Sequence, residues 1–477
     1  MDAKLIWTKL LSTKRLGREG DPGFSDETRS EFDRDYDRIV FSSAFRRLKD
    51  KTQVFPLSRN DFTRTRLTHS IEAACVGRSL GRKIGDAMQS AGELPDSRID
   101  IGSILAAACL AHDIGNPPFG HSGEAAIQSW AEQSLGIADD VGDASAEASD
   151  MASDGEQPAR PKSIILDTAQ QLQDLCEFEG NAQAMRVVTR LQLGRRRGGL
   201  QLTHATIGAM MKYPCGSLVD GKPRKKEQIE QKKFGYFVDD DALIVDGLQD
   251  LGMVAAGTGA FRRHPLAFLV EAADDICYAI IDLEDSVDQK LVDLESAIAI
   301  LEPLAKRVET YSPSGYKGHS YLQWLRAYAI HGLVTACASA FRENAPSILD
   351  GTFNKSLVQA TPAVDEYAAV KAEVARTAYV DSRVLAVELA GFQVIKGLLD
   401  IFVTALLTPD KKYSKKLLAI FPASYLGEQD REGDKRSALD KLSTYQRVLA
   451  ATDYVSGMTD SFAVNLYQEL SGIKLPE

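Results

Sequence analysis

The chain has few of the features that mark secreted, disulfide-bonded or membrane-spanning proteins. Its 477 residues include six cysteines, none of them in a Cys-x-x-Cys pair, so we expect reduced thiols in a reducing compartment. Lysines and a tryptophan interrupt the first ten residues, so no signal peptide is visible. The longest uninterrupted apolar run, residues 104–111, is too short to cross a bilayer. These absences favour a cytoplasmic protein that does not enter a membrane.

A positive net charge is also missing. The chain has 56 Lys and Arg against 67 Asp and Glu, a net charge of −11, which argues against non-specific binding of nucleic acid over its whole surface. A phosphate-binding enzyme would still need a local basic pocket. The length predicts two or three structural units with a large core. Because such a core needs no metal for folding, a bound metal would serve chemistry.

Strand signals are few, and the helical period of apolar residues runs through most of the chain, which predicts an all-α fold. One amphipathic helix over residues 67–84 carries His69. A buried helix over 101–111 ends at His112 and Asp113, where a glycine and two prolines follow. Further long helices are expected over 265–287, 364–407 and 437–471, and at most one short hairpin, between 236–238 and 243–245.

Two segments differ from this helical pattern. Residues 136–162 are rich in Asp and Glu, with little that could be buried, so we expect a disordered acidic insertion in a surface loop. It separates a helix expected to end near Leu135 from one expected to start near Ile164. Residues 220–233 are a second expected loop, rich in Lys and Arg.

Histidines and carboxylates occur on three of the expected helices. His112 and Asp113 end one helix, where both side chains can reach one ion, and His69 can approach from the preceding helix. The third helix offers the carboxylates of Glu271, Asp274, Asp275 and Asp282. A carboxylate on a buried surface needs a cation or hydrogen bonds. Nitrogen and oxygen ligands together suit Mn, Fe, Co, Ni or Mg.

A His–Asp pair alone is more often an exposed hydrogen-bonded pair than a metal site. The whole string from His112 to His121, His-Asp-Ile-Gly-Asn-Pro-Pro-Phe-Gly-His, is hard to explain by packing. It ends an apolar helix, fixes a turn with two glycines and two prolines, and brings back a second histidine. We therefore predict a metal site that includes His69 and the His112–Asp113 pair.

Eight further short segments are motifs that bear on the comparison with known families. They are Arg34-Asp-Tyr-Asp-Arg38, Phe45-Arg-Arg-Leu48, Lys51-Thr-Gln-Val54, Arg66-Leu-Thr-His-Ser70, Phe178-Glu-Gly-Asn-Ala-Gln183, Lys212-Tyr-Pro214, Glu271-Ala-Ala-Asp-Asp-Ile-Cys-Tyr278 and Tyr454-Val-Ser-Gly-Met-Thr-Asp460. In these motifs and their order the chain resembles the deoxyguanosinetriphosphate triphosphohydrolase family, within the HD-domain superfamily. The resemblance runs from about Trp7 to past residue 460. It implies an HD-domain helical bundle over residues 1–290 and a helical C-terminal region over 291–477 that completes the pocket and the oligomer contacts.

The metal ligands that the resemblance implies are His69, His112, Asp113 and Asp274. Asp274 is preferred to Asp275 because the family's aspartate lies four residues before a substrate-contacting tyrosine, here Tyr278. Four protein ligands leave two octahedral positions for water and a phosphate oxygen. The implied cofactor is a divalent ion: Mg, Mn, Co or Ni.

The implied reaction is hydrolysis of a deoxynucleoside triphosphate (dNTP), with dGTP preferred, to a deoxynucleoside and tripolyphosphate. His121 is the implied general acid or base, and Glu124 its orienting partner. The implied substrate contacts are Gln53, Arg66, Asn181, Lys212, Tyr213, Lys233, Tyr278 and Asp282. Members of the family usually form rings or dimers of dimers, which implies a homo-oligomer such as a hexamer.

Two alternatives stay open. The first is another HD phosphohydrolase reaction, that of a nucleotidase or phosphodiesterase. The second is a nucleic-acid-binding regulator whose pocket senses a nucleotide, with single-stranded nucleic acid as a partner. Arg195–Arg197 and the lysines of 222–233 motivate the second alternative.

Other arginines have simpler interpretations. We expect Arg46 and Arg47 to form ion pairs with Asp35 or Asp37. Arg447 resembles an arginine that reaches an active site in some relatives.

Overall fold

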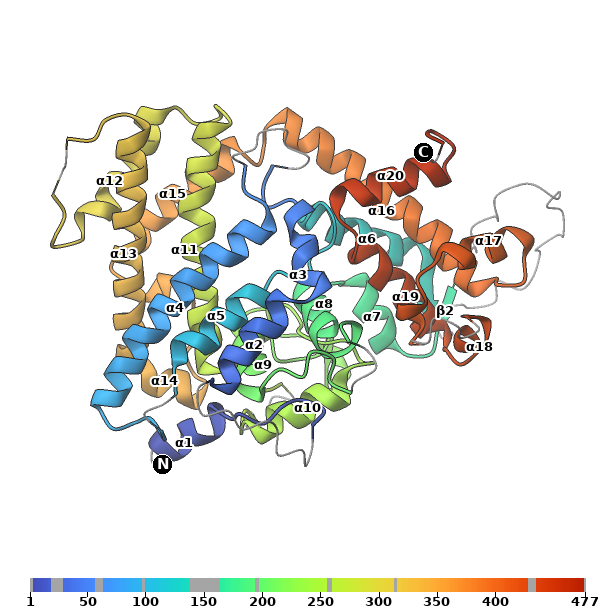
Figure 1. The fold of residues 1–477 in the computed structure, drawn as a ribbon, viewed down its shortest axis with the longest axis horizontal. Coiled ribbons are helices and arrows are strands. Elements are labelled where there is room, and N and C mark those ends of the chain that lie inside the picture. Colours follow the sequence, from blue (N-terminus) through green and yellow to red (C-terminus); the bar gives the residue numbers. More distant parts are fainter. Residues whose placement is uncertain are drawn as a thin grey trace.

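Helices dominate the computed structural model of the chain (Figure 1). The structure describes residues 3–18, 29–55, 63–96, 99–137, 164–193, 197–254, 260–312, 315–427 and 435–475. Within these ranges the strands form two short pairs. The predicted all-α class is therefore confirmed.

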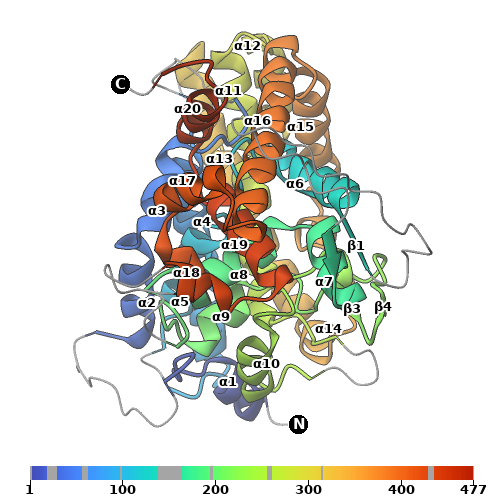
Figure 2. The same ribbon diagram turned by 90° about the vertical axis from the view of Figure 1, so that its right-hand side faces the viewer.

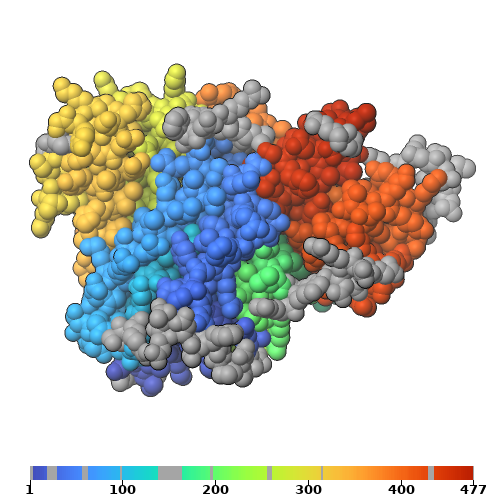
Figure 3. Space-filling view, in the orientation of Figure 1, coloured from blue at the N-terminus to red at the C-terminus, as the bar shows by residue number. Residues whose placement is uncertain are grey.

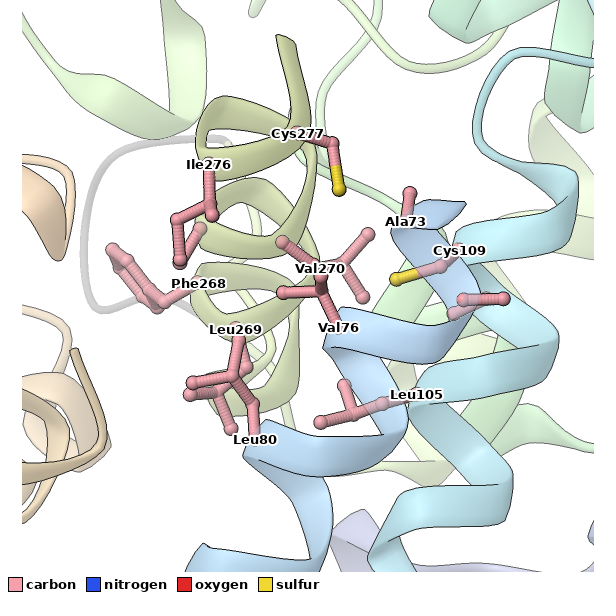
Figure 4. Packing of buried hydrophobic residues seen from close by; sticks show 14 of the residues in the cluster. Ala73, Val76, Leu80, Leu105, Cys109, Phe268, Leu269, Val270, Ile276 and Cys277 are labelled. Carbon is pink, nitrogen blue, oxygen red and sulfur yellow. The ribbon is translucent and has the colours of Figure 1, made fainter. Parts of the chain in front are cut away.

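Three helices form the centre of the molecule: α4 (Arg66–Ser90), α5 (Ile101–Ala111) and α11 (Pro265–Asp288). Their apolar faces meet in one cluster, in which α4 contributes Val76, α5 contributes Leu105 and α11 contributes Val270 (Figure 4). All of α5 except Ser103 is buried, as its apolar sequence predicts. Burial of this kind contributes about 25 cal/mol per Å² of apolar surface.

Glycine allows α4 and α5 to approach closely. A Cβ atom on Gly81 would lie 2.7 Å from the backbone of Gly102 in α5. Only hydrogen fits between the two backbones at this crossing. The helix ends are also set by local sequence, since Asp100 caps α5 through Gly102 N, and Pro265 takes the first position of α11.

The other helices surround this centre in order along the chain. The N-terminal ones are α1 (Ala3–Leu10), α2 (Glu31–Val40), α3 (Ser43–Arg47), α6 (His121–Ser134), α7 (Ala169–Cys176), α8 (Gly180–Arg186), α9 (His204–Met210) and α10 (Asp241–Asp250). The later ones are α12 (Leu294–Lys306), α13 (His319–Glu343), α14 (Ala345–Asp350), α15 (Val364–Thr377), α16 (Ser382–Leu407), α17 (Lys412–Ile420), α18 (Lys435–Asp440), α19 (Thr444–Ser456) and α20 (Asp460–Leu470). Short 3-10 turns cover Leu48–Asp50, Ile229–Gln231, Val358–Ala360 and Ala423–Leu426, and a π-helical turn covers Val187–Leu191.

The helices after residue 290 lie on two sides of the centre. α12, α13 and α15 pack near α11 at one end, while α16, α17, α19 and α20 form the other end with α6 (Figures 1 and 3). Two hydrophobic clusters follow this division, one around α4, α5 and α11 and one around α6, α16 and α19. The boundary at residue 290 stays a prediction.

The predicted position of the hairpin was wrong. Residues 243–245 lie in α10, and the hairpin forms instead between β3 (Leu218–Val219) and β4 (Lys222–Pro223). Asp220 and Gly221 turn it with positive φ angles of 51° and 70°, which an Asp-Gly pair adopts readily.

A strand, rather than a helix, begins at Ile164. β1 (Leu135–Ile137) and β2 (Ile164–Leu166) pair in parallel, beside α7 (Figure 2). The first two residues of the expected acidic insertion, 136–137, therefore belong to a strand, and residues 138–163 lie outside the described part. Its predicted disorder remains a prediction.

Helix α16 was not anticipated as a candidate membrane span. By length and composition it could cross a bilayer, but 56% of its most apolar window is buried inside the protein. Asp400 accepts a hydrogen bond from Trp130 Nε1 of α6 at 2.7 Å, and Lys396 contacts Gln133 of α6. α16 is therefore the core helix of the second hydrophobic cluster.

Candidate metal centre and catalytic site

Each of the three central helices brings one predicted ligand to the same point. His69 lies on α4, His112 follows α5, and Asp274 lies on α11. One ligand atom from each lies within 4.8 Å of the others. Asp274 Oδ1 is 3.1 Å from His69 Nε2 and 3.3 Å from His112 Nε2. Two imidazoles and a carboxylate at this spacing could hold a divalent cation.

The hydrogen bonds of His112 favour a cation at this point. Its Nδ1 lies 2.6 Å from the Cys109 carbonyl, which can only accept a hydrogen bond. In the neutral ring Nδ1 therefore carries the proton, and Nε2 presents a lone pair. Nε2 is buried without a hydrogen-bond partner, next to the carboxylates of Asp274 and Asp113. Metal-binding histidines commonly donate their second ring N–H to a backbone carbonyl, as His112 does to Cys109. The other nitrogen, Nε2, is then free to coordinate a cation between it and the carboxylates.

Asp113 lies at the edge of this group. Its Oδ1 is 3.5 Å from His112 Nε2, and it is not part of the three-residue cluster. Arg66 donates to its Oδ2 and Asn116 to its Oδ1, both at 2.6 Å. Burial alone would raise the pKa of Asp113, but Arg66 and His112 hold that pKa far below its usual value. The carboxylate stays ionised, as a ligand requires.

The two adjacent aspartates of α11 differ sharply. Burial raises the pKa of both groups, but Lys212 Nζ lies 2.6 Å from Asp274 and, with His112, holds the pKa of Asp274 well below its usual value. Burial and the nearby Glu271 and Asp274 raise the pKa of Asp275 to about 6. Only Asp274 joins the histidine cluster. The geometry favours Asp274 over Asp275 as the ligand.

His121 and Glu124 meet at the start of α6. His121 Nδ1 is 2.9 Å from Glu124 Oε2, and Glu124 Oε1 accepts a hydrogen bond from Gly180 N at 2.8 Å. Glu124 is buried, whereas the His121 side chain is 79% exposed. The hydrogen bond that His121 donates to Glu124 raises the pKa of His121. This pair is oriented like a general acid with its supporting carboxylate.

Gly180 connects this pair with the metal side of the site. A Cβ atom at position 180 would lie 2.1 Å from Asn116 Oδ1 and 2.7 Å from Glu124 Oε1. Asn116 in turn holds Asp113. Any larger side chain would displace one of these groups.

Two of the predicted substrate residues contact the proposed ligands directly. Lys212 contacts Asp274, and Arg66 contacts Asp113. Tyr213 lies beneath the Arg263 guanidinium, 5.8 Å from the ring centre. Gln53 Oε1 is buried without a hydrogen-bond partner among the described residues.

Tyr278 and Asp282 lie on one face of α11, as their spacing predicts. Tyr379 contacts both: its hydroxyl donates to Asp282 Oδ2 at 3.1 Å, and its ring centre is 6.4 Å from that of Tyr278. Tyr278 and Tyr379 line part of a cavity of about 270 Å³. Asn181 and Lys233 both contact Glu179, at 3.4 and 2.5 Å.

Sequence reasoning missed the residues that support these groups. Arg263 donates to the Lys212 carbonyl and makes two bonds to Glu271. Lys51 Nζ donates to the carbonyls of Asn116 and Ser456, at 2.5 and 2.8 Å. Except for the bonds between Arg263 and Glu271, these contacts join segments far apart in the sequence, so no local pattern predicts them.

Asp460 supports the His112–His121 loop from the C-terminal region. It accepts hydrogen bonds from Thr52 N at 2.9 Å and Phe119 N at 3.0 Å. Its motif was noted in the sequence, but not this role. The contact joins the C-terminal region to this loop; that the region completes the pocket stays a prediction.

The arginine expectations were wrong where they can be tested. Asp35 pairs with Arg15 and Asp37 pairs with Arg29, so neither takes Arg46 or Arg47. Arg447 donates to the Leu442 and Leu406 carbonyls and not to the groups of the site. In the basic loop, Arg224 and Lys226 pair with Glu177. Of Arg195–Arg197, the first two lie outside the described residues.

Comparisons with known proteins identify the family of the chain. The HD domain model matches residues 66–178. A deoxyguanosinetriphosphate triphosphohydrolase-like protein of Synechocystis is 38% identical over 98% of this chain and 100% of its own length. One of Listeria monocytogenes is 36% identical over 98% and 99%. A deoxyguanosinetriphosphate triphosphohydrolase of Enterobacter is 31% identical over 93% and 94%. The chain therefore belongs to the deoxyguanosinetriphosphate triphosphohydrolase-like family of HD-domain hydrolases.

Proposed function

We propose that this protein is a metal-dependent dNTP triphosphohydrolase that releases tripolyphosphate and a deoxynucleoside, with dGTP as the preferred substrate. The observation that carries the proposal is the position of His112 Nε2, which is buried without a hydrogen-bond partner and faces two carboxylates beside His69. A proton-transfer pair lies at the other end of the same loop. The full-length relatives support the substrate class.

His69, His112, Asp113 and Asp274 would hold the ion. When bound, a divalent ion supplies Lewis-acid polarisation of a phosphoryl oxygen and acidifies a water molecule. The coordinating oxygens and nitrogens suit Mg, Mn, Co or Ni. The chain's own contribution is to keep Asp113 and Asp274 ionised through Arg66 and Lys212.

His121 delivers a proton to the departing 5′ oxygen. Water attacks the α-phosphorus and forms a new P–O bond, while the bond from that phosphorus to the 5′ oxygen breaks. Glu124 raises the pKa of His121, which favours the imidazolium that an acid must be. The N–H of Gly180 donates to the other carboxylate oxygen of Glu124 and so holds the orientation of that carboxylate.

The remaining residues bind the substrate. Lys212, Arg66 and Lys233 provide positive charge for a triphosphate, which the acidic chain as a whole lacks. Tyr278 would stack on the deoxyribose, where a close ring leaves no room for a 2′ hydroxyl. Gln53, Asn181, Tyr213 and Asp282 complete the proposed pocket. We further expect a cytoplasmic homo-oligomer.

The deciding experiment assays the four dNTPs, alone and in pairs, with Mg, Mn and Co. We expect tripolyphosphate from dGTP above the others, and none from the His112→Ala variant. Orthophosphate from dAMP or dGMP, without tripolyphosphate from any dNTP, would instead favour a nucleotidase. Stimulation of one dNTP by another would indicate a second nucleotide site.

Single-stranded nucleic acid is the second candidate partner, because of one surface cavity. This cavity of about 640 Å³ is lined by Arg38, Arg46 and Arg47, together with Phe41 and Tyr425. None of the three arginines forms an ion pair with a carboxylate in the described part of the chain; they contact backbone carbonyls or the Tyr425 hydroxyl. Cations beside aromatic rings suit phosphates and bases.

A salt-sensitive complex with a single-stranded oligonucleotide, lost in an Arg46→Glu, Arg47→Glu variant, would support this second function. Steady dNTP hydrolysis by the purified protein without any oligonucleotide would reject a pure sensor.

A further inference from the structure

Glu179 is a buried carboxylate among the predicted substrate contacts. It lies in the Phe178–Gln183 motif, but the sequence predicts no role for it. It precedes α8 and is 5% exposed. Its Oε1 accepts hydrogen bonds from Lys233 Nζ at 2.5 Å and Asn181 Nδ2 at 3.4 Å. The Lys233 side chain remains 37% exposed. The ammonium is thus accessible from solvent, while its partner carboxylate is not.

Glu179 also adjoins the proton-transfer pair. The next residue, Gly180, donates its N–H to Glu124, which holds His121. The charged groups that face Glu179 are Glu124 and His121 from α6 and Lys233 from the loop after Ile229–Gln231, and Tyr213 also faces Lys233. Burial and the charge of Glu124 raise the pKa of Glu179 to about 7, against the attraction of Lys233.

We propose that Glu179 is a positioning residue that holds Lys233 beside the His121–Glu124 pair and competes with the substrate's phosphates for that ammonium. This inference rests on the proposed function, because only a polyanionic substrate makes the competition matter. Ionised Glu179 neutralises Lys233 and repels the phosphates. Protonated Glu179 leaves the charge of Lys233 available to them.

The direction of the pH dependence follows from linkage. An anion bound beside Glu179 favours its protonated form, so binding takes up a proton. Affinity is therefore highest below pH 7 and falls as the pH rises through the pKa of Glu179. One unit of change in that pKa on binding corresponds to a tenfold change in affinity.

The test measures binding of inorganic tripolyphosphate to the full-length protein by calorimetry at pH 6 and pH 8, with excess Mg²⁺. Glu177→Gln is the matched control, since Glu177 pairs with Lys226 and Arg224 of the same loop, two residues before Glu179. We expect Glu179→Gln to bind roughly tenfold more tightly than wild type at pH 8 and about equally at pH 6. The control should follow the wild type at both pH values, which also corrects for titration of the ligand itself.

Several results would overturn the assignment. They are an unchanged pH 8 affinity in Glu179→Gln, weaker binding at both pH values in a variant with wild-type thermal stability, and no binding of tripolyphosphate to the wild type. A kinetic measurement separates this inference from the proposed function. If no dNTP is hydrolysed, the proposed function fails; if dNTPs are hydrolysed but KM has the same pH profile in Glu179→Gln and wild type, only the role of Glu179 fails.

Discussion

His112 shows how a single residue can indicate a metal site. Its Nδ1 is committed to the Cys109 carbonyl, so its buried Nε2 meets carboxylates with a lone pair. A neutral histidine that bound no cation would need a hydrogen-bond donor opposite Nε2, because the two carboxylates can only accept. The neighbouring Lys212 does not fill this place, because it donates to Asp274 Oδ2 and not to His112.

Asp274→Ala should abolish both metal binding and hydrolysis, whereas Asp275→Ala should retain both at reduced levels. The reason is that only Asp274 joins the two histidines. Metal content of the purified variants and the tripolyphosphate assay measure the two effects. The reverse ranking, with less metal in Asp275→Ala, would contradict the ligand assignment.

Gly180→Ala should lower kcat by at least about 100-fold while the metal stays bound. The added methyl group would push Glu124 or Asn116 aside, and a misplaced proton donor costs about this factor. Gly85→Ala is the control, because the nearest atom to its Cβ is 3.9 Å away and alanine stabilises a helix interior by about 0.5–1 kcal/mol. Wild-type kcat in Gly180→Ala would show that Glu124 is not needed.

At the scale of elements, helix ends connect distant parts of the chain. His264 precedes α11, and its Nδ1 accepts the N–H of Leu266 at 3.1 Å. Its Nε2 is 3.0 Å from the Leu10 carbonyl at the end of α1. The bond from Leu266 requires an unprotonated Nδ1, while Nε2 carries the proton that it donates to Leu10. Burial lowers the pKa of His264 to about 4.

Stability should therefore depend on pH between about 4 and 6.5. The unfolded histidine binds a proton below pH 6.5, but the folded one does so only below about 4. The contribution of His264 is complete above 6.5 and is lost as the pH falls, on the order of 3 kcal/mol in all. Denaturant unfolding from pH 4 to 7 measures it. In His264→Asn, which can still cap α11, this part of the slope should vanish; an identical slope would assign it to other groups.

The β1–β2 pair determines how a deletion should behave. Parallel pairing of Leu135 with Ile164 brings Ile137 within about 8 Å of Ile164. If residues 138–158 are deleted, the remaining five residues, 159–163, can span up to about 20 Å. We expect Tm within about 2 °C of wild type and unchanged basal hydrolysis.

A longer deletion that also removes Leu135–Ile137 is the comparison, and it should lower Tm. If the shorter deletion lowers Tm as much, the acidic segment contributes to the fold.

At the scale of the whole molecule, the sequence was most informative where chemistry and helical period coincide. The choice of Asp274 among the carboxylates of the third helix rested on the family resemblance, but the helices that carry His69 and Asp274 and the one that ends before His112 could be predicted from their apolar spacing. Glu179, Arg263 and Tyr379 could not, because each acts through a contact between distant segments. The hairpin at Asp220–Gly221 was missed because its strands are only two residues long, too short for an alternating pattern.

The division of the later helices around the centre has a consequence for synthesis of the chain. α6 carries His121, but its apolar face packs on α16, and Trp130 meets Asp400 270 positions later. A ribosome needs roughly tens of seconds to make that much chain. During that interval α4 and α5 can already pack together, while Trp130 and its neighbours lack their partner. The growing chain would thus have an assembled metal centre only after α11, and a covered catalytic helix only after α16. This places its greatest need for chaperone protection in the second half of translation.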